Sequence, residues 1–98
     1  MADLIVVYWR DIPAQVIVKA GRTTERRQLA KRFEVAIDAA AMHAGMTGTD
    51  AYLEQWRRAD PEPVDGDMAQ AADAAVEQLE TEFDKDKLKA LVHNGGNA

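Results

Sequence analysis

The chain has 98 residues, no cysteine and a formal net charge of −5. This length suits one domain with one hydrophobic core and leaves no room for a separate catalytic lobe. Without cysteine, disulfides, thiolate catalysis and cysteine-ligated metal centres are excluded. No apolar run approaches the roughly 20 residues of a membrane-spanning helix, and the first run lacks the flanks of a secretion signal. We therefore expect a folded cytoplasmic protein that makes no membrane contact.

The first expected element is a strand at residues 3–10, which are mostly β-branched and aromatic. Pro13 has no backbone donor and restricts Ile12 to extended conformations, so residues 11–14 are predicted to form a turn. A second strand is predicted at residues 15–20. Together the two strands predict an antiparallel hairpin.

One long amphipathic helix is predicted at about residues 24–44, because apolar side chains recur there at intervals of three and four. Thr23 or Thr24 can cap its start, and Gly45 can end it. A shorter helix is predicted to begin at Thr49 or Asp50 and to stop before residue 60.

Residues 60–66 contain two prolines, one glycine and three acids, a composition typical of an exposed linker. Helical spacing returns at residues 67–83, and Asp84 is placed to cap a further helix. Residues 94–98 are predicted to be a helix end followed by a frayed tail.

These elements predict an α+β fold, in which an N-terminal antiparallel β-hairpin packs on a long helix and two to three further helices follow. We divide the chain into a hairpin and two-helix part (residues 1–59), a Pro-rich acidic linker (60–66) and an acidic helical segment of the same domain (67–98).

The first strand is apolar on both of its faces, a pattern typical of a strand buried on two sides. Two strands alone are marginally stable in water, so something must cover the second face and at least one edge. Either the helices cover both faces within the monomer, or the hairpin edge pairs with another copy or another protein. An exposed Trp9 or Trp56 would suit such a contact.

The residues offer no chemistry that would make or break a covalent bond. Serine is absent, and His43 and His93 lack a carboxylate at metal-ligand spacing. The many acids after residue 76 follow a polar helix face, where solvation is the default, and no glycine-rich loop could hold a phosphate. We expect no catalytic residue, no metal and no cofactor, and we do not expect the chain alone to be an enzyme.

Basic side chains gather at the predicted start of the long helix: Arg22, Arg26, Arg27, Lys31 and Arg32. They could be solvated, or they could pair with the C-terminal part, where residues 59–98 hold three basic residues and ten acids. They could instead meet an acidic partner protein or the phosphates of a nucleic acid. The net charge and the lack of a recognition motif disfavour nucleic acid.

Residues 5–16 carry a family resemblance centred on Tyr8-Trp9-Arg10-Asp11-Ile12-Pro13. Together with the arginine-rich stretch that follows, this strand–turn–strand motif resembles the small virulence factor domain, which is also part of conserved virulence factor C. The resemblance covers about residues 4–58 and implies no known biochemical activity. Free-standing members tend to lie near genes of folate-dependent one-carbon metabolism, which implies an accessory protein to a folate or methyl-transfer enzyme.

We therefore expect a non-enzymatic protein-binding or accessory module that docks through its hairpin and the basic start of the long helix. The expected contact residues are Tyr8, Trp9, Arg10, Asp11, Pro13, Arg26, Arg27 and Lys31. The alternatives are a self-assembling homodimer with a structural role and, less favoured, a nucleic-acid-binding domain.

Overall fold

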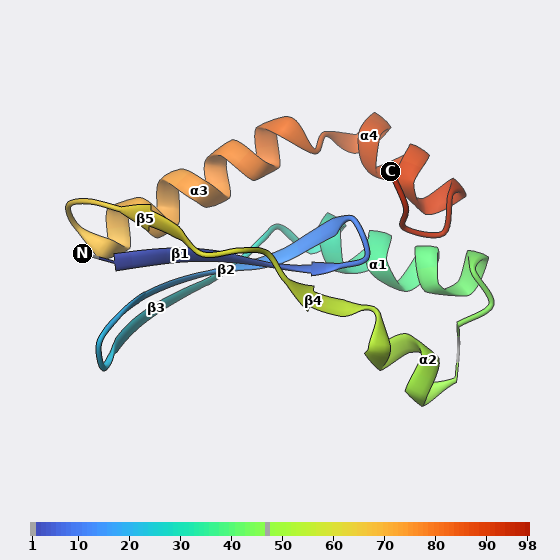
Figure 1. Ribbon diagram of the computed structural model, residues 1–98. Coiled ribbons are helices and arrows are strands. Elements are labelled where there is room, and N and C mark those ends of the chain that lie inside the picture. Colours follow the sequence, from blue (N-terminus) through green and yellow to red (C-terminus); the bar gives the residue numbers. More distant parts are fainter. Residues whose placement is uncertain (1, 47) are drawn as a thin grey trace.

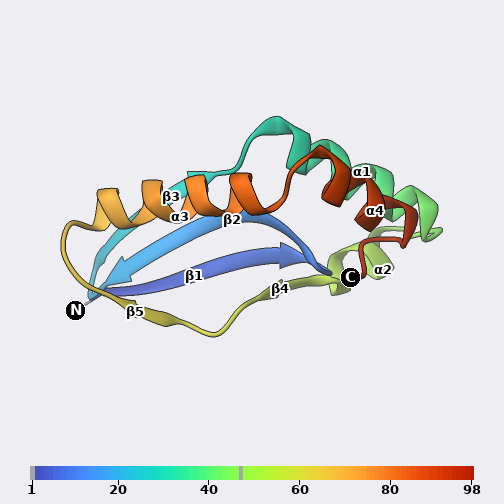
Figure 2. The same ribbon diagram turned by 90° about the horizontal axis from the view of Figure 1, so that it is seen from above.

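The computed structural model describes residues 2–46 and 48–98. Strands β1 (Ala2–Trp9) and β2 (Ile12–Ala20) form the expected antiparallel hairpin, and β3 (Thr23–Gln28) pairs with the outer side of β2. On the other side of β1 lie two short antiparallel strands, β4 (Trp56–Arg58) and β5 (Glu62–Val64). Strand β1 is therefore interior to a five-stranded sheet (Figures 1 and 2).

Four helices complete the α+β fold: α1 (Lys31–His43), α2 (Thr49–Glu54), α3 (Met68–Glu82) and α4 (Lys85–His93). Helix α3 lies along one face of the sheet, against β2 and β3, and α4 packs on α1 beyond the end of the sheet (Figure 1). Helix α2 lies on the opposite side of the sheet from α3 (Figure 1). The predicted fold class is confirmed.

The predicted start of the long helix is wrong, because residues 23–28 form a strand. Gly21, at φ 59°, makes the turn that sends the chain back along β2. This strand has no apolar residue, so its sequence contains no period-2 signal to distinguish it from a polar helix start. The helix begins at Lys31 with Ala30 as its N-cap, and neither Thr23 nor Thr24 caps it.

The second helix is also shorter than predicted, and residues 60–66 are not simply a linker. Helix α2 ends at Glu54, and the chain enters β4 at once. Within the predicted linker, residues 62–64 pair with the first part of β1. The backbone groups on this side of β1 need hydrogen-bond partners, and β4, β5 and the Ala59 N–H, which donates to the Val6 carbonyl, supply them.

The helices of the C-terminal part confirm the prediction, whereas the tail does not. Asp67 and Asp84 cap α3 and α4 with their side chains. The predicted frayed tail is instead held in place, since Gly95 and Gly96 are buried. The hairpin turn also differs: it lies at residues 10–11, and Pro13 is already part of β2.

The hydrophobic core lies between the sheet and the helices on the α3 side. Val16 and Val18 of β2 are fully buried and belong to it. Phe33 of α1 and Phe83, which follows α3, meet with ring centroids 6.4 Å apart. The core thus joins the N-terminal and C-terminal parts of the chain.

Candidate functional site

The face of the sheet opposite α3 has a helix only at one end, where Tyr52 of α2 stacks on Trp9 of β1. Over the rest of β1, β2 and β3 this face carries no helix in the described part of the chain (Figure 1). Cross-strand partners place their side chains on the same face. Ile17 of β2 pairs with Ile5 of β1 and with Arg26 of β3, so all three share the face that points away from Val16 and Val18. We call it the open face, and the register assigns to it Asp3, Ile5, Val7, Gln15, Ile17, Lys19, Thr24, Arg26, Gln28, Arg58 and Pro63.

The centre of the open face is an apolar row that is nearly inaccessible to solvent. Ile17 is 2% exposed and Val7 9%, yet neither belongs to the core cluster on the helix side. Because no helix lies over them, the long side chains around them in the sheet must cover them. Lys and Arg can do this, since their aliphatic stems lie on apolar surface while their charged ends stay in water.

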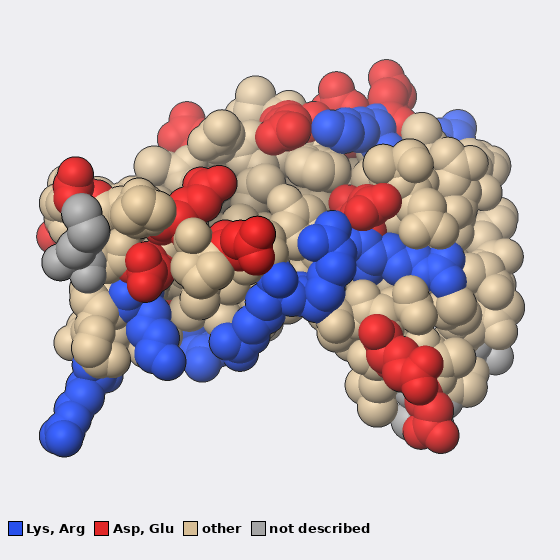
Figure 3. Space-filling model, in the orientation of Figure 1, with Lys and Arg blue, Asp and Glu red and all other residues tan. Residues whose placement is uncertain are grey.

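The charges of the open face are mostly positive. Lys19, Arg26 and Arg58 lie on it, and none of the three forms an ion pair among residues 2–46 and 48–98. Its one acid in the paired rows is Asp3, which stands opposite Lys19. Figure 3 shows Lys and Arg side chains along the hollowed lower side of the molecule. A basic concave surface therefore exists on a protein whose net charge is negative.

A cavity of about 250 Å³ opens at one end of this face, where β3 leads into α1. Gln28 of the open face lines it, together with Tyr52 of α2 and Trp56 of β4. The two aromatic rings stand nearly perpendicular, at 83°, with centroids 6.1 Å apart. Glu34 and Asp38 of α1 complete its polar wall. Sequence reasoning missed this cavity because its walls come from five separate elements, β2, β3, α1, α2 and β4.

The residues of the Trp-Arg-Asp turn hold the fold together. Trp9 is 0% exposed, and its indole Nε1 donates to the Tyr52 carbonyl at 2.9 Å. The Arg10 guanidinium donates to the Gln55 side chain and to the Gly95 carbonyl. Trp9 and the fully buried Pro13 cannot touch a partner without rearrangement of the turn.

Asp11 of the same turn is also used within the chain. Its backbone N–H donates to the Gly96 carbonyl at 2.8 Å, and its side chain accepts a hydrogen bond from the Ala98 N–H at 2.7 Å. The Arg57 guanidinium lies 3.2 Å from the Asp11 carboxylate and also stacks over the Tyr8 ring, 4.6 Å from its centroid. The turn thus joins β1, β4 and the C-terminal tail.

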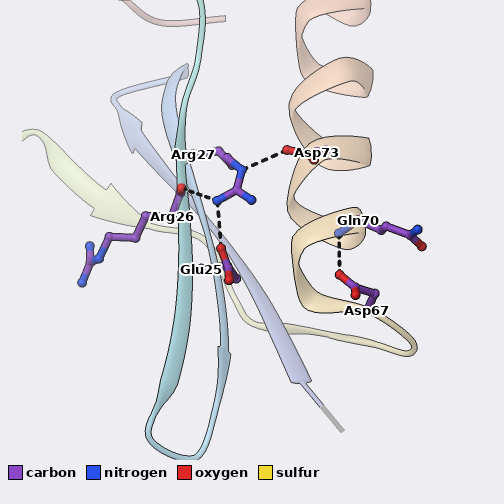
Figure 4. Close-up of polar contacts among 6 residues, drawn as sticks. All are labelled: Glu25, Arg26, Arg27, Asp67, Gln70 and Asp73. Atoms are coloured by element: carbon purple, nitrogen blue, oxygen red, sulfur yellow. Dashed lines mark hydrogen bonds and ion pairs between the residues drawn. The ribbon is translucent and has the colours of Figure 1, made fainter.

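The structure separates the predicted basic cluster. The Arg27 side chain points toward α3, where it donates to Asp73 at 2.9 Å, and it also pairs with Glu25 (Figure 4). Arg26 points away from α3 on the open face (Figure 4). Lys31 is exposed at the first residue of α1. Pairing with the acidic C-terminal part, one of the expected arrangements, is found for Arg27.

The two histidines lie on different helices but meet in space. The rings of His43 and His93, near the ends of α1 and α4, have centroids 5.6 Å apart. Among the described residues no group of three potential metal ligands occurs. The same part of the chain contains no helix with the length and apolar character needed to cross a membrane.

Comparison with known families gives a match over most of the chain. The model of a family described as "Virulence factor" matches residues 7–92, which extends from β1 into α4. The match thus includes α3, beyond the residues 4–58 on which the resemblance was based. No curated protein and no solved structure gives a significant match. By the extent of the family match, the chain belongs to the virulence factor family.

Proposed function

We propose that this protein is a non-enzymatic binding module that docks the open face of its sheet onto an acidic surface of a partner protein. The observation that carries the proposal is the sheet face without a helix, whose apolar centre is surrounded by Lys19, Arg26 and Arg58. Protein interfaces commonly combine an apolar centre with a polar rim. Complementary charge on the partner would speed its approach and fix its orientation.

The proposed contact set differs from the one expected from the sequence. Arg26 remains in it, and Lys19 and Arg58 join it because they share its face. Arg27 is left out because Asp73 and Glu25 already neutralise it. The Trp-Arg-Asp turn acts indirectly, by holding β4 beside β1.

The family resemblance supports one class of partner, an enzyme of folate-dependent one-carbon metabolism. An accessory protein of this kind needs a docking surface and no catalytic group of its own. A purified partner of that class would bind with an affinity that falls as salt is added, because the contact is partly electrostatic.

The open face is a poor match to a nucleic acid. Sheets that bind single strands stack bases on exposed aromatic rings. Here the middle of the face is aliphatic, with Ile5, Val7 and Ile17. Self-assembly through the hairpin edge is also disfavoured, since β1 and β2 are each paired on both sides and the outer strand β3 carries charges that discourage edge pairing.

Affinity capture from the native lysate with charge-reversal variants tests the proposal. The variant Arg26→Glu with Arg58→Glu reverses two charges of the open face, and Lys85→Glu with Lys89→Glu makes the same change on α4 as a matched control. We expect quantitative mass spectrometry to find partners that the wild type and the control retain and the open-face variant loses. Equal retention by both variants would contradict the proposal.

A second experiment asks whether the open face serves self-association. Light scattering of the protein alone at high micromolar concentration should give a monomeric mass. A dimeric mass that the open-face variant abolishes would show that the face serves self-association instead.

A further inference from the structure

The cavity at the end of the open face has a combination of walls that the docking proposal does not use. Its volume, about 250 Å³, lies below the usual size of a drug-binding pocket and suits a small ion or head group. Two of its walls are the perpendicular rings of Tyr52 and Trp56. The acidic side chains of Glu34 and Asp38 also line the cavity.

The buried Trp9 holds the two aromatic walls of the cavity in place. Trp9, which has no exposed surface, stacks on the Tyr52 ring with a centroid distance of 5.7 Å and an interplanar angle of 29°. The same Trp9 donates its indole N–H to the Tyr52 carbonyl. Pairing of Trp56 with Trp9 across β4 and β1 fixes the backbone of the second wall. A ligand would therefore meet preorganised rings, which lowers the entropic cost of binding.

The carboxylates make the cavity electronegative. Glu34 and Asp38 lie one helical turn apart on α1, a spacing at which like charges repel. Neither forms an ion pair within the described ranges 2–46 and 48–98. Burial raises the pKa of the Tyr52 phenol, and the charges of Asp38 and Glu34 raise it further, which is the response expected of an acid close to negative charge. A cation in the cavity would relieve this repulsion.

We propose that this cavity binds a small quaternary ammonium ion. Such a cation donates no hydrogen bonds, so it is recognised by aromatic faces together with nearby negative charge. A divalent metal ion would instead require several oxygen ligands arranged around it, whereas the residues that line this cavity include only two carboxylates, beside aromatic and aliphatic side chains. The inference does not depend on the docking function, because the ligand is held by α1, α2 and β4.

Titration followed by NMR tests the inference directly. The chain has two tryptophans, so its indole N–H region contains two signals. We expect tetramethylammonium and choline to shift the Trp56 signal in a saturable manner at millimolar concentration. The neutral isostere of choline, 3,3-dimethylbutan-1-ol, should bind more weakly. Equal binding of the neutral isostere, or no saturable shift with either cation, would overturn the inference.

Matched variants test the role of the acids. Glu34→Gln with Asp38→Asn keeps the shape of the cavity and removes its charge, and the exposed positions are expected to tolerate the change. We expect affinity for choline to fall about five-fold or more. Asp60→Asn with Asp65→Asn removes the same total charge elsewhere and should bind as the wild type does. An equal loss in both pairs would show general attraction to an acidic protein and would overturn the site.

Discussion

The indole of Trp9 lies directly against the backbone of Gly96, so that the C-terminal tail packs on the hairpin turn. A Cβ added at position 96 would lie 2.8 Å from Cζ3 of the indole, closer than real Cβ contacts occur. The Gly96 carbonyl also accepts the Asp11 N–H. The family motif at the turn and the C-terminal glycines are therefore parts of one structural unit.

Gly96→Ala should destabilise the protein more than other glycine substitutions. The residue has φ +95°, which strains an L-amino acid, and the new methyl group would collide with a fully buried ring. We expect a loss of roughly 2–4 kcal/mol in the free energy of unfolding, measured by urea denaturation. Gly48→Ala is the matched control, because a Cβ at position 48 meets nothing within 4 Å. Equal stability of the two variants would show that the tail does not pack on Trp9.

The sequence predicted those helices and strands whose determining residues lie close together in the chain. The apolar stripe identified α3, and a single aspartate marked the break before α4 at Asp84. The hairpin was predicted from Pro13 and two β-branched runs. In each case the residues that determine the element lie within a few positions of one another.

The remaining strands depend on pairing between distant residues. Strand β3 is entirely polar, and β4 and β5 have three residues each, so neither period 2 nor length identifies them. The two apolar faces of β1 did predict that the strand lies inside a larger assembly. They did not predict that β4 and β5 of the same chain would complete it, nor that one face would be covered by neighbouring side chains in place of helices.

The candidate sites were hidden for the same reason. Arg26 and Arg27 are adjacent in the sequence, yet they lie on opposite faces of the sheet once the segment is a strand. A helical reading placed both in one cluster. The cavity walls, Glu34, Tyr52 and Trp56, come together only through the tertiary fold.

Ile17→Ala should show that the apolar row of the open face contributes to folding. Ile17 is 2% exposed although no helix lies over it, so its removal leaves a cavity between neighbouring side chains of the sheet. We expect a loss of about 2–4 kcal/mol. Val35→Ala on α1, where the side chain is 56% exposed, should change stability by less than about 0.5 kcal/mol. If Ile17→Ala lowered the free energy of unfolding as little as Val35→Ala does, the open face would be loosely packed.

The two tyrosines should ionise above their ordinary pKa of 10.0 in the folded protein. Burial raises the pKa of Tyr8, against the lowering effect of Arg57, and burial with the Asp38 charge raises that of Tyr52. The neutral phenols are thus favoured in the fold, while the unfolded chain ionises at about pH 10. Their contribution to stability is fully present below pH 10 and is lost as the pH rises through the folded pKa values.

Tyrosinate absorbance measures this directly, because the chain has only two tyrosines. Tyr8→Phe leaves Tyr52 as the single signal, and Glu34→Gln with Asp38→Asn should then lower its pKa toward the ordinary value. Ionisation of both phenols at or below pH 10 in the folded chain would contradict the expected burial.

The two aspartate caps should each contribute measurably to the C-terminal helices. Asp67 accepts the Gln70 N–H at 3.0 Å (Figure 4), and Asp84 accepts the Lys87 N–H at 2.9 Å. Replacement of either by alanine should cost about 1 kcal/mol, whereas asparagine should preserve most of the stability. Asp65→Ala, in the loop before α3, is the control and should have little effect. The cap at Asp84 also allows α4 to leave the line of α3 and pack on α1. Loss of this cap should therefore perturb the NMR signals of residues in the α1–α4 contact. Loss of the Asp67 cap should leave these signals unchanged.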